Sequence, residues 1–327
     1  MTVVNFPGER EPASFMWAIL ALLLPFSGIS KACIHIAFAI PGTDDPLRRA
    51  LYAGALCEVV HGDDNFILIM RKIQGHASLP AGYNLRTIKR DITFPKFEAS
   101  FNKISSSQSH LGSVIAICQL LFSCLTLYHT RGNQIQLYGY AAFGFTVVPY
   151  AVMSFVNLVA NLLTPHYPTM YMVRTPLMAE AEEAGGRFEG VIATVDSDRD
   201  DRFQPIRRYF ILACVLAILA LIAPYIILKT LTGFESGDST EAQRGWTMGW
   251  LVIGQFYGVL ATLVSLQIWD DNKPIAMQFD EGPQYERMLC GFILFCGTVV
   301  PSVAAIGGFV VVGQMLVVHG DCSSTAL

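Results

Sequence analysis

The sequence predicts an all-α fold: a polytopic transmembrane helix bundle with about six crossings and two small extramembrane loop regions. Of its 327 residues, 53% are apolar and only 15% are charged, which is not the composition of a soluble surface. The apolar residues also occur in runs of about 20, long enough for a helix to cross about 30 Å of hydrocarbon. These runs lack the alternation of barrel strands. Residues 1–327 are therefore expected to form a single membrane domain.

The predicted crossings follow one another along the chain and carry almost no charge. The shortest, 111–128, lies near the lower length limit for a crossing. Because a backbone in lipid must satisfy its own hydrogen bonds, each run is expected to be helical. The five longer runs cover 14–34, 137–163, 209–231, 246–269 and 288–318.

The first run could instead be the apolar region of a signal peptide, cleaved after the small residues Ser30 and Ala32. A signal peptide has a positively charged flank on its N-terminal side. Here that flank is Glu-Arg-Glu over 9–11, which is net acidic. We therefore predict an uncleaved first helix.

The distribution of basic residues predicts the orientation. The segments 41–110, 164–208 and 270–287 hold most of the 22 lysines and arginines. With six crossings and an uncleaved first helix, all three segments fall on one side of the membrane, and the positive-inside rule assigns that side to the cytosol. Both termini then face outward.

The first cytosolic loop, 41–110, is predicted to contain short amphipathic helices. Asp45 as N-cap and Pro46 at the first position open one helix, over about 46–58. A second apolar face recurs at helical spacing near the end of the loop. It could lie on the inner leaflet or pack on the rest of the loop. Its members are Phe94, Phe97, Phe101 and Ile104.

The second cytosolic loop, 164–208, is predicted to contain one short helix and an acidic linker. Thr175 as N-cap and Pro176 at the first position begin a helix over 176–184, which the glycines at 185–186 end. The linker at 196–201 has aspartates at the first three ligand positions of a calcium loop. However, an aspartate occupies the required glycine position and Arg207 the terminal glutamate position. A solvated linker is the favoured interpretation.

Composition and motifs exclude several functions. A net charge of -4 without a dense basic block argues against a nucleic-acid partner. The eight cysteines lie mostly in apolar runs, and no CxxC or His/Cys spacing predicts a metal site. No nucleophile elbow or phosphate loop occurs. We therefore expect no cofactor, no metal and no catalytic residue.

The third crossing carries polar residues along one helix face, and we call this set of residues the polar stripe. It could line a solute path or a binding cavity, or its side chains could bond neighbouring helices. Both interpretations stay open. Gln119 and Gln255 on other crossings are predicted to form interhelical hydrogen bonds. The stripe consists of Thr146, Tyr150, Ser154, Asn157 and Asn161.

Small and charged residues add two expectations. Two pairs of glycines four residues apart, Gly245 with Gly249 and Gly254 with Gly258, predict close helix packing. The partner helix could be internal or on a second copy, so the oligomeric state stays open. Lys31 lies inside the first run, where it could form part of an ion path. We instead predict that its stem extends to the cytosolic interface.

Several segments resemble a group of uncharacterised multi-pass membrane proteins of filamentous fungi. They cover roughly a fifth of the chain and include YHTRGNQI at 128–135, YGYAAFG at 138–144, PYAVMSFVN at 149–157, PTMY at 168–171 and GGRFEG at 185–190. The resemblance implies a fungal source and a eukaryotic membrane. Because that group has no established activity, the resemblance supplies no functional residue.

Two function classes follow from the residues. In the first, the protein is a non-enzymatic scaffold or partner-binding membrane subunit, in which the helices at 46–58 and 176–184 recognise a protein. In the second, it is a channel or facilitator for a small solute, lined by the third crossing. A membrane-embedded enzyme is the least favoured alternative. The partners expected are the lipid bilayer and a protein at the cytosolic loops.

Overall fold

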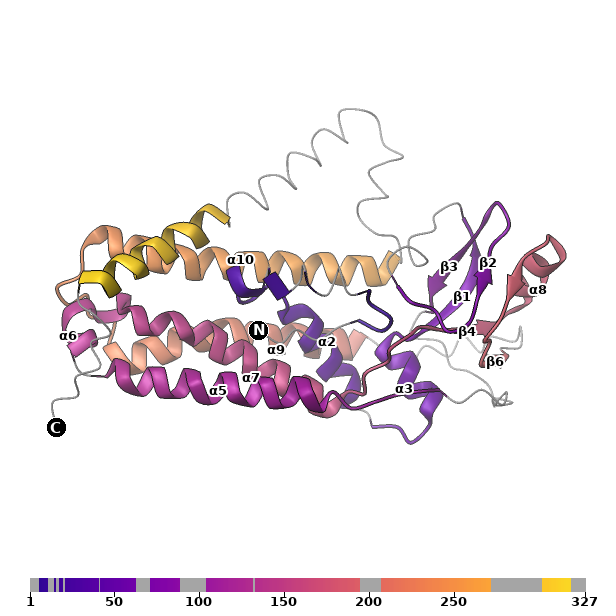
Figure 1. Cartoon of the computed structure of the whole chain (residues 1–327), viewed down its shortest axis with the longest axis horizontal. Helices are drawn as coiled ribbons and strands as arrows, with labels where there is room; N and C mark the ends of the chain where they lie inside the picture. The colour runs from indigo at the N-terminus through magenta and orange to yellow at the C-terminus, as the bar shows by residue number, and fades with distance from the viewer. Residues whose placement is uncertain are drawn as a thin grey trace, which may run out of the picture.

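A computed structural model shows a mostly helical chain, with a long helix bundle and a small β-containing unit at one end of it (Figure 1). The structure describes residues 6–10, 15, 18–19, 21–40, 42–62, 71–88, 104–131, 133–194, 207–271 and 302–318, with the backbone alone at 207 and 260–271.

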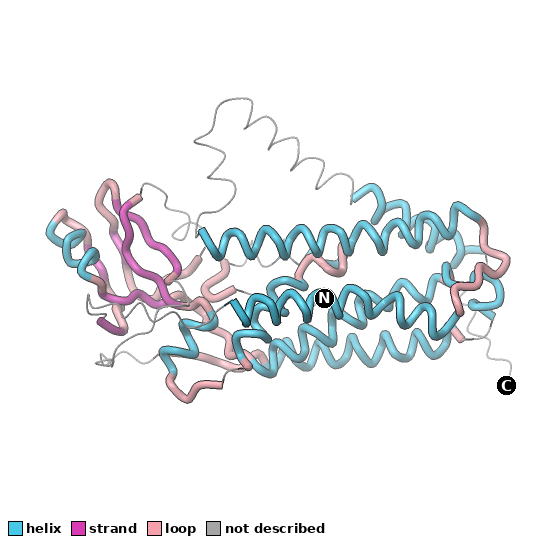
Figure 2. The backbone as a smooth tube through the Cα atoms, turned by 180° about the vertical axis from the view of Figure 1, so that it is seen from behind, coloured by secondary structure: helices cyan, strands magenta, loops and turns pink. Residues whose placement is uncertain are grey.

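The bundle is built from long helices that run side by side (Figure 2). Two short 3₁₀ segments, η1 and η2, precede α7, and the helix Ser302–Val318 lies beside α10. The labelled elements are α2 (Ile29–Ala39), α5 (His110–Thr130), α6 (Asn133–Tyr138), η1 (Gly139–Ala141), η2 (Phe143–Val147), α7 (Val148–Leu163), α9 (Arg207–Thr232) and α10 (Glu241–Asp271).

Within the described residues, three helices are long and apolar enough to cross a membrane: His110–Thr130, Phe143–Leu163 and Arg208–Thr232. Their outer faces carry large apolar side chains, such as Leu111 at 74% exposed and Phe122 at 67%. Apolar surface of this extent is unfavourable in water and suits lipid.

The first apolar run is not the continuous helix predicted over 14–34. A turn at 24–28, around Pro25, precedes α2, which has only 11 residues. Proline removes a backbone donor and disfavours helix at the residue before it, so it interrupts the run. Of the last predicted crossing, 288–318, only Ser302–Val318 lies within the described residues.

Both predicted helix starts in the loops are confirmed. Asp45 accepts a hydrogen bond from the Leu47 amide at 3.0 Å and opens α3, Pro46–Ala53. The Thr175 hydroxyl accepts one from the Met178 amide at 3.3 Å and opens α8, Pro176–Glu183. Helix α3 ends earlier than predicted because Gly54, with φ 74°, adopts the left-handed conformation and caps it, and a strand follows at residue 56.

The two loops combine into one small unit that contains β-strands, which the all-α prediction did not include. Its four-stranded sheet has the order β3-β1-β4-β6, and a separate pair joins β2 to β5. Strand β1 of the first loop lies parallel to β4 of the second, with Leu56 opposite Tyr171. The strands are β1 (Leu56–His61), β2 (Ala77–Ser78), β3 (Tyr83–Thr87), β4 (Tyr171–Arg174), β5 (Arg187–Phe188) and β6 (Ala193–Thr194).

These strands could not be predicted from the sequence, because each has at most six residues and most pair with a distant segment, so no local alternation accumulates. The second predicted helix of the first loop lies outside the described residues except for Ile104, which packs against the core of the unit. The acidic linker at 196–201 also lies outside them.

The predicted close packing at glycines is confirmed on one part of α10. A Cβ at Gly258 would lie 2.9 Å from both the Cβ and the carbonyl oxygen of Phe26, in the turn before α2. The partner of this glycine is therefore internal. Gly245 and Gly249 have no atom within 4 Å of a Cβ position among the described residues.

Substituting alanine at Gly258 should lower stability, whereas the same change at Gly245 should not. At Gly258 the added methyl overlaps the Phe26 backbone, and such overpacking costs about 1–3 kcal/mol. At Gly245 the methyl meets no described atom within 4 Å, and alanine favours helix by up to about 1 kcal/mol. Thermal unfolding of the two variants in detergent measures the difference. Equal melting temperatures would contradict this packing.

Candidate functional site

The first three residues of the polar stripe bond to different partners. Thr146 lies on η2, where its hydroxyl donates to the Phe143 carbonyl at 2.6 Å. The Tyr150 hydroxyl donates to the Leu22 carbonyl at 2.5 Å, which joins α7 to the first apolar run. The Ser154 hydroxyl donates to Gln119 Oε1 at 3.3 Å, which joins α7 to α5. These three hydroxyls thus form local and inter-segment hydrogen bonds.

The last two residues of the stripe differ in burial, since Asn161 is only half-buried. Asn157 is fully buried. Asn161 faces α5, where its Nδ2 is 3.4 Å from the position that a Cβ would take at Gly112. A binding role for the stripe stays a prediction.

Both predicted interhelical glutamines are confirmed. Gln119 accepts from Ser154 across α5 and α7. Gln255 on α10 donates to the Leu221 carbonyl at 2.7 Å and accepts from the Tyr225 hydroxyl at 2.6 Å, both on α9. Amide side chains that bridge helices stabilise membrane bundles by about 0.6–2 kcal/mol each.

The small β-containing unit has its own apolar core and an acidic outer face on α8. This helix buries Met178 and Ala181 against the strands. Its outer face carries Glu180, Glu182 and Glu183, and the exposed Glu189 follows β5. The first two glutamates have partners in the unit: Glu180 accepts from the Tyr83 hydroxyl at 3.1 Å, and Glu182 pairs with Arg174. Glu183 and Glu189 present their carboxylates to solvent.

The core of the unit holds no reactive thiol. Cys57, on β1, is fully buried, and its Sγ donates to the Tyr171 carbonyl at 3.5 Å. Burial raises the pKa of the Cys57 thiol to about 12, so the thiolate needed for nucleophilic chemistry does not form near neutral pH. Burial also raises the pKa of Tyr167 in the same core to about 12.

A buried charged cluster attaches the N-terminal segment to α2 and to the unit. Lys31 Nζ lies 3.5 Å from Glu9 Oε1, and the two side chains are only 3% and 8% exposed. The Lys31 stem thus ends at a buried carboxylate, and its extension to the cytosolic interface stays a prediction. The Phe6 ring lies 4.5 Å from Lys31 Nζ and 5.3 Å from the Arg71 guanidinium carbon, within range of cation–π attraction.

Backbone pairing brings Arg71 to the cluster, because Glu9 and Arg71 form an antiparallel bridge. Burial lowers the pKa of Arg71, and the charge of Glu9 opposes that shift. One carboxylate thus faces two cations. The sequence could not reveal this cluster, since its members come from three distant segments and follow no spacing.

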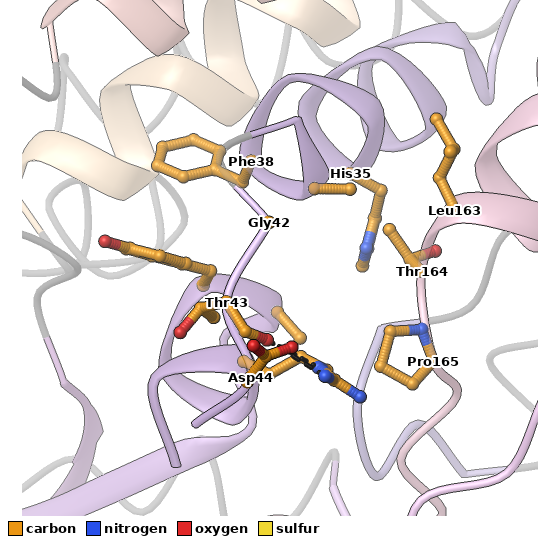
Figure 3. A pocket seen from close by; sticks show the side chains of 12 residues that line it. His35, Phe38, Gly42, Thr43, Asp44, Leu163, Thr164 and Pro165 are labelled. Atoms are coloured by element: carbon orange, nitrogen blue, oxygen red, sulfur yellow. Dashed lines mark hydrogen bonds between the residues drawn. The ribbon is translucent and has the colours of Figure 1, made fainter. Parts of the chain in front are cut away.

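A cavity of about 270 Å³ lies where α2 and α7 end and α3 begins. Figure 3 shows His35 of α2 between Phe38 on one side and Thr164 and Pro165 on the other, with Thr43 and Asp44 facing it. Arg49 and Tyr52 of α3 also line the cavity. The Arg49 guanidinium donates from Nε and Nη2 to the Thr43 carbonyl at 3.3 and 2.9 Å. No motif marked this site in the sequence.

Comparisons with protein-family models, curated proteins and solved structures give no match. The resemblance to fungal membrane proteins therefore stays a prediction, as do the source and the membrane that it implies. Within the described ranges, no three His, Cys, Asp or Glu side chains are placed to hold a metal ion. The aspartates at 196, 198 and 200 lie outside those ranges.

Removing the carboxylate of the charged cluster should be more damaging than removing its lysine. Glu9→Gln removes the carboxylate that pairs with the buried Lys31 and that opposes the pKa shift of Arg71, and breaking a buried pair costs about 3–5 kcal/mol. Lys31→Met leaves Glu9 beside Arg71, so a smaller loss is expected. Denaturant unfolding in detergent measures both, with the exposed Glu189→Gln as the control. A larger loss for Lys31→Met would contradict the arrangement.

Proposed function

We propose that this protein is a six-crossing membrane protein whose cytosolic unit binds a protein partner, so that it acts as a non-enzymatic scaffold or partner-binding subunit. The observation that carries the proposal is the pairing of β1 with β4. It joins the two basic loops into one folded unit outside the helices.

The membrane placement is supported by the three long apolar helices and by the position of the loops. Helices α5 and α7 pack against each other, and the chain leaves the unit along α5 and returns to it along α7. The two loops rich in lysine and arginine therefore lie at the same end of the bundle. The positive-inside rule favours the cytosol for that end.

The acidic face of α8 favours a partner with a basic surface. Glu183 and Glu189 are exposed and have no ion-pair partner in the part of the chain that the structure describes. Charges at the rim of an interface select partners of opposite charge and accelerate association. Since α8 also buries Met178 and Ala181, deleting it would unfold the unit, and only surface substitutions can test binding.

The channel alternative has weaker support. Asn157 is fully buried, whereas a side chain that faces an open path would be accessible from it. The hydroxyls of Tyr150 and Ser154 bond to neighbouring segments rather than facing a cavity, which also favours a packing role. An enzyme remains the least favoured alternative.

Single cysteines at the two ends of the bundle should differ in accessibility from outside the cell or organelle. Ser106 lies at the end that carries the unit, and Ser236 lies in the turn between α9 and α10 at the other end; both are exposed. On a background without native cysteines, an impermeant thiol reagent should label Ser236→Cys in sealed membranes and Ser106→Cys only after permeabilisation. The opposite pattern would reverse the orientation, and labelling of both in sealed membranes would exclude the six-crossing arrangement.

Reversing charge on the acidic face should release the partner. In a Glu183→Lys, Glu189→Lys double variant, the new lysines should repel a basic surface and lower its retention at least tenfold, which is about 1.4 kcal/mol. Quantitative mass spectrometry of co-purified proteins measures retention. Glu235→Lys, an exposed glutamate at the far end of the bundle, is the matched control. The same set of proteins with all three samples would refute the proposal.

A further inference from the structure

The cavity between α2, α3 and α7 has the position of a membrane boundary site. Leu163 and Thr164, which line it, lie at the end of the apolar span Phe143–Leu163. If that span crosses the bilayer, its end lies in the headgroup region. The inference below rests on this membrane placement, which is part of the proposed function, but not on the protein partner.

One wall of the cavity suits a phosphate group. Arg49 is exposed at the cavity, and no carboxylate pairs with its guanidinium within the described residues. Its bonds to the Thr43 carbonyl hold it in place. An arginine orientated in this way is a preferred ligand for phosphate oxygens, to which it can donate several hydrogen bonds. The His35 ring lies on the same cavity and can also donate, whereas the Thr164 hydroxyl already donates to the Ala160 carbonyl at 2.6 Å.

Another wall suits an ammonium group. The rings of Phe38 and Tyr52 have centroids 6.3 Å apart and both line the cavity. The exposed carboxylate of Asp44 lines the same cavity and has no hydrogen bond or ion pair to any described residue. Aromatic faces next to a carboxylate attract organic cations. The site thus offers opposite charges for the two ends of a zwitterion.

The size of the cavity fits a headgroup rather than a whole amphiphile. A volume of about 270 Å³ is slightly below the usual range for drug-sized ligands. Leu163, which lines the cavity, is 51% exposed. Ile40, which follows the lining residue Ala39, is 58% exposed, and Leu162, which precedes Leu163, is 62% exposed. These apolar side chains provide a surface along which acyl chains can lie. This surface favours a lipid over a soluble phosphorylated amine.

We propose that this cavity binds the headgroup of a phospholipid that carries both a phosphate and an ammonium group. Arg49 holds the phosphate, and Asp44 with the rings of Phe38 and Tyr52 holds the ammonium. The acyl chains lie over Leu162 and Leu163.

The test measures lipid binding to the purified full-length chain in a non-ionic detergent. Phosphatidylcholine and phosphatidylglycerol are titrated separately, and native mass spectrometry counts the bound lipids. Arg49→Gln should weaken phosphatidylcholine binding about tenfold, the usual worth of a charge-assisted hydrogen bond. Arg48→Gln is the matched control, because Arg48 lies on the same helix, is exposed and does not line the cavity. It should leave binding unchanged within twofold.

Asp44→Asn separates the two halves of the site without removing a hydrogen bond seen in the structure. It should weaken the binding of phosphatidylcholine but not that of phosphatidylglycerol, which has no ammonium. An equal effect of Arg48→Gln and Arg49→Gln would overturn the proposal. So would phosphatidylglycerol binding as tightly as phosphatidylcholine, because the site would then recognise only an anion. Displacement of the lipid by an equal concentration of free phosphocholine would assign the cavity to a soluble ligand instead.

Discussion

Strands β1 and β4 come from loops that helices α5 and α7 separate in the chain, and their parallel pairing holds both ends of that helical hairpin at one end of the bundle. Backbone hydrogen bonds extend the pairing on both sides: Tyr171 donates to the Ala55 carbonyl at 2.8 Å, and Ile192 donates to the Met172 carbonyl at 3.0 Å. Because buried backbone groups must be paired, these strands require one another. Without the pairing, neither loop would have a core to fold around.

The N-terminal segment is attached to the unit and to α2 by backbone hydrogen bonds and by an ion pair. Gly8 donates to the Tyr167 carbonyl at 3.2 Å and accepts from the Lys72 amide at 2.6 Å, which places Glu9 beside Arg71 and above Lys31. Burying such a cluster costs desolvation free energy, so it contributes little net stability. The cluster does favour this packing of the N-terminal segment, since moving the segment away would take Glu9 from the buried Lys31. The bundle and the unit are thereby held together by the N-terminal segment as well as by the chain connections.

Helix α3 connects the cavity with the interior of the unit. Leu47 and Leu51 on one side of the helix belong to the core that includes Tyr171, whereas Arg49 and Tyr52 on the other side line the cavity. A headgroup held by α3 would therefore contact an element that also supports the strands. Helix α8 lies on the same unit, but its apolar side packs on a different core cluster and its acidic face points outward. Lipid and protein recognition can thus occupy separate surfaces of one small folded unit.

The sequence by itself determined the features that depend on neighbouring residues. It predicted the apolar helices that became α5, α7 and α9, the caps at Asp45 and Thr175, the bridging glutamines and the close approach at Gly258. Helical periodicity, capping and small side chains act over one or two turns, so their pattern is visible locally. The strands, the pairing of Lys31 with Glu9 and the cavity beside Arg49 were decided only by the tertiary structure. Each joins segments far apart in the chain, and contacts of that kind leave no period or spacing in the sequence that forms them.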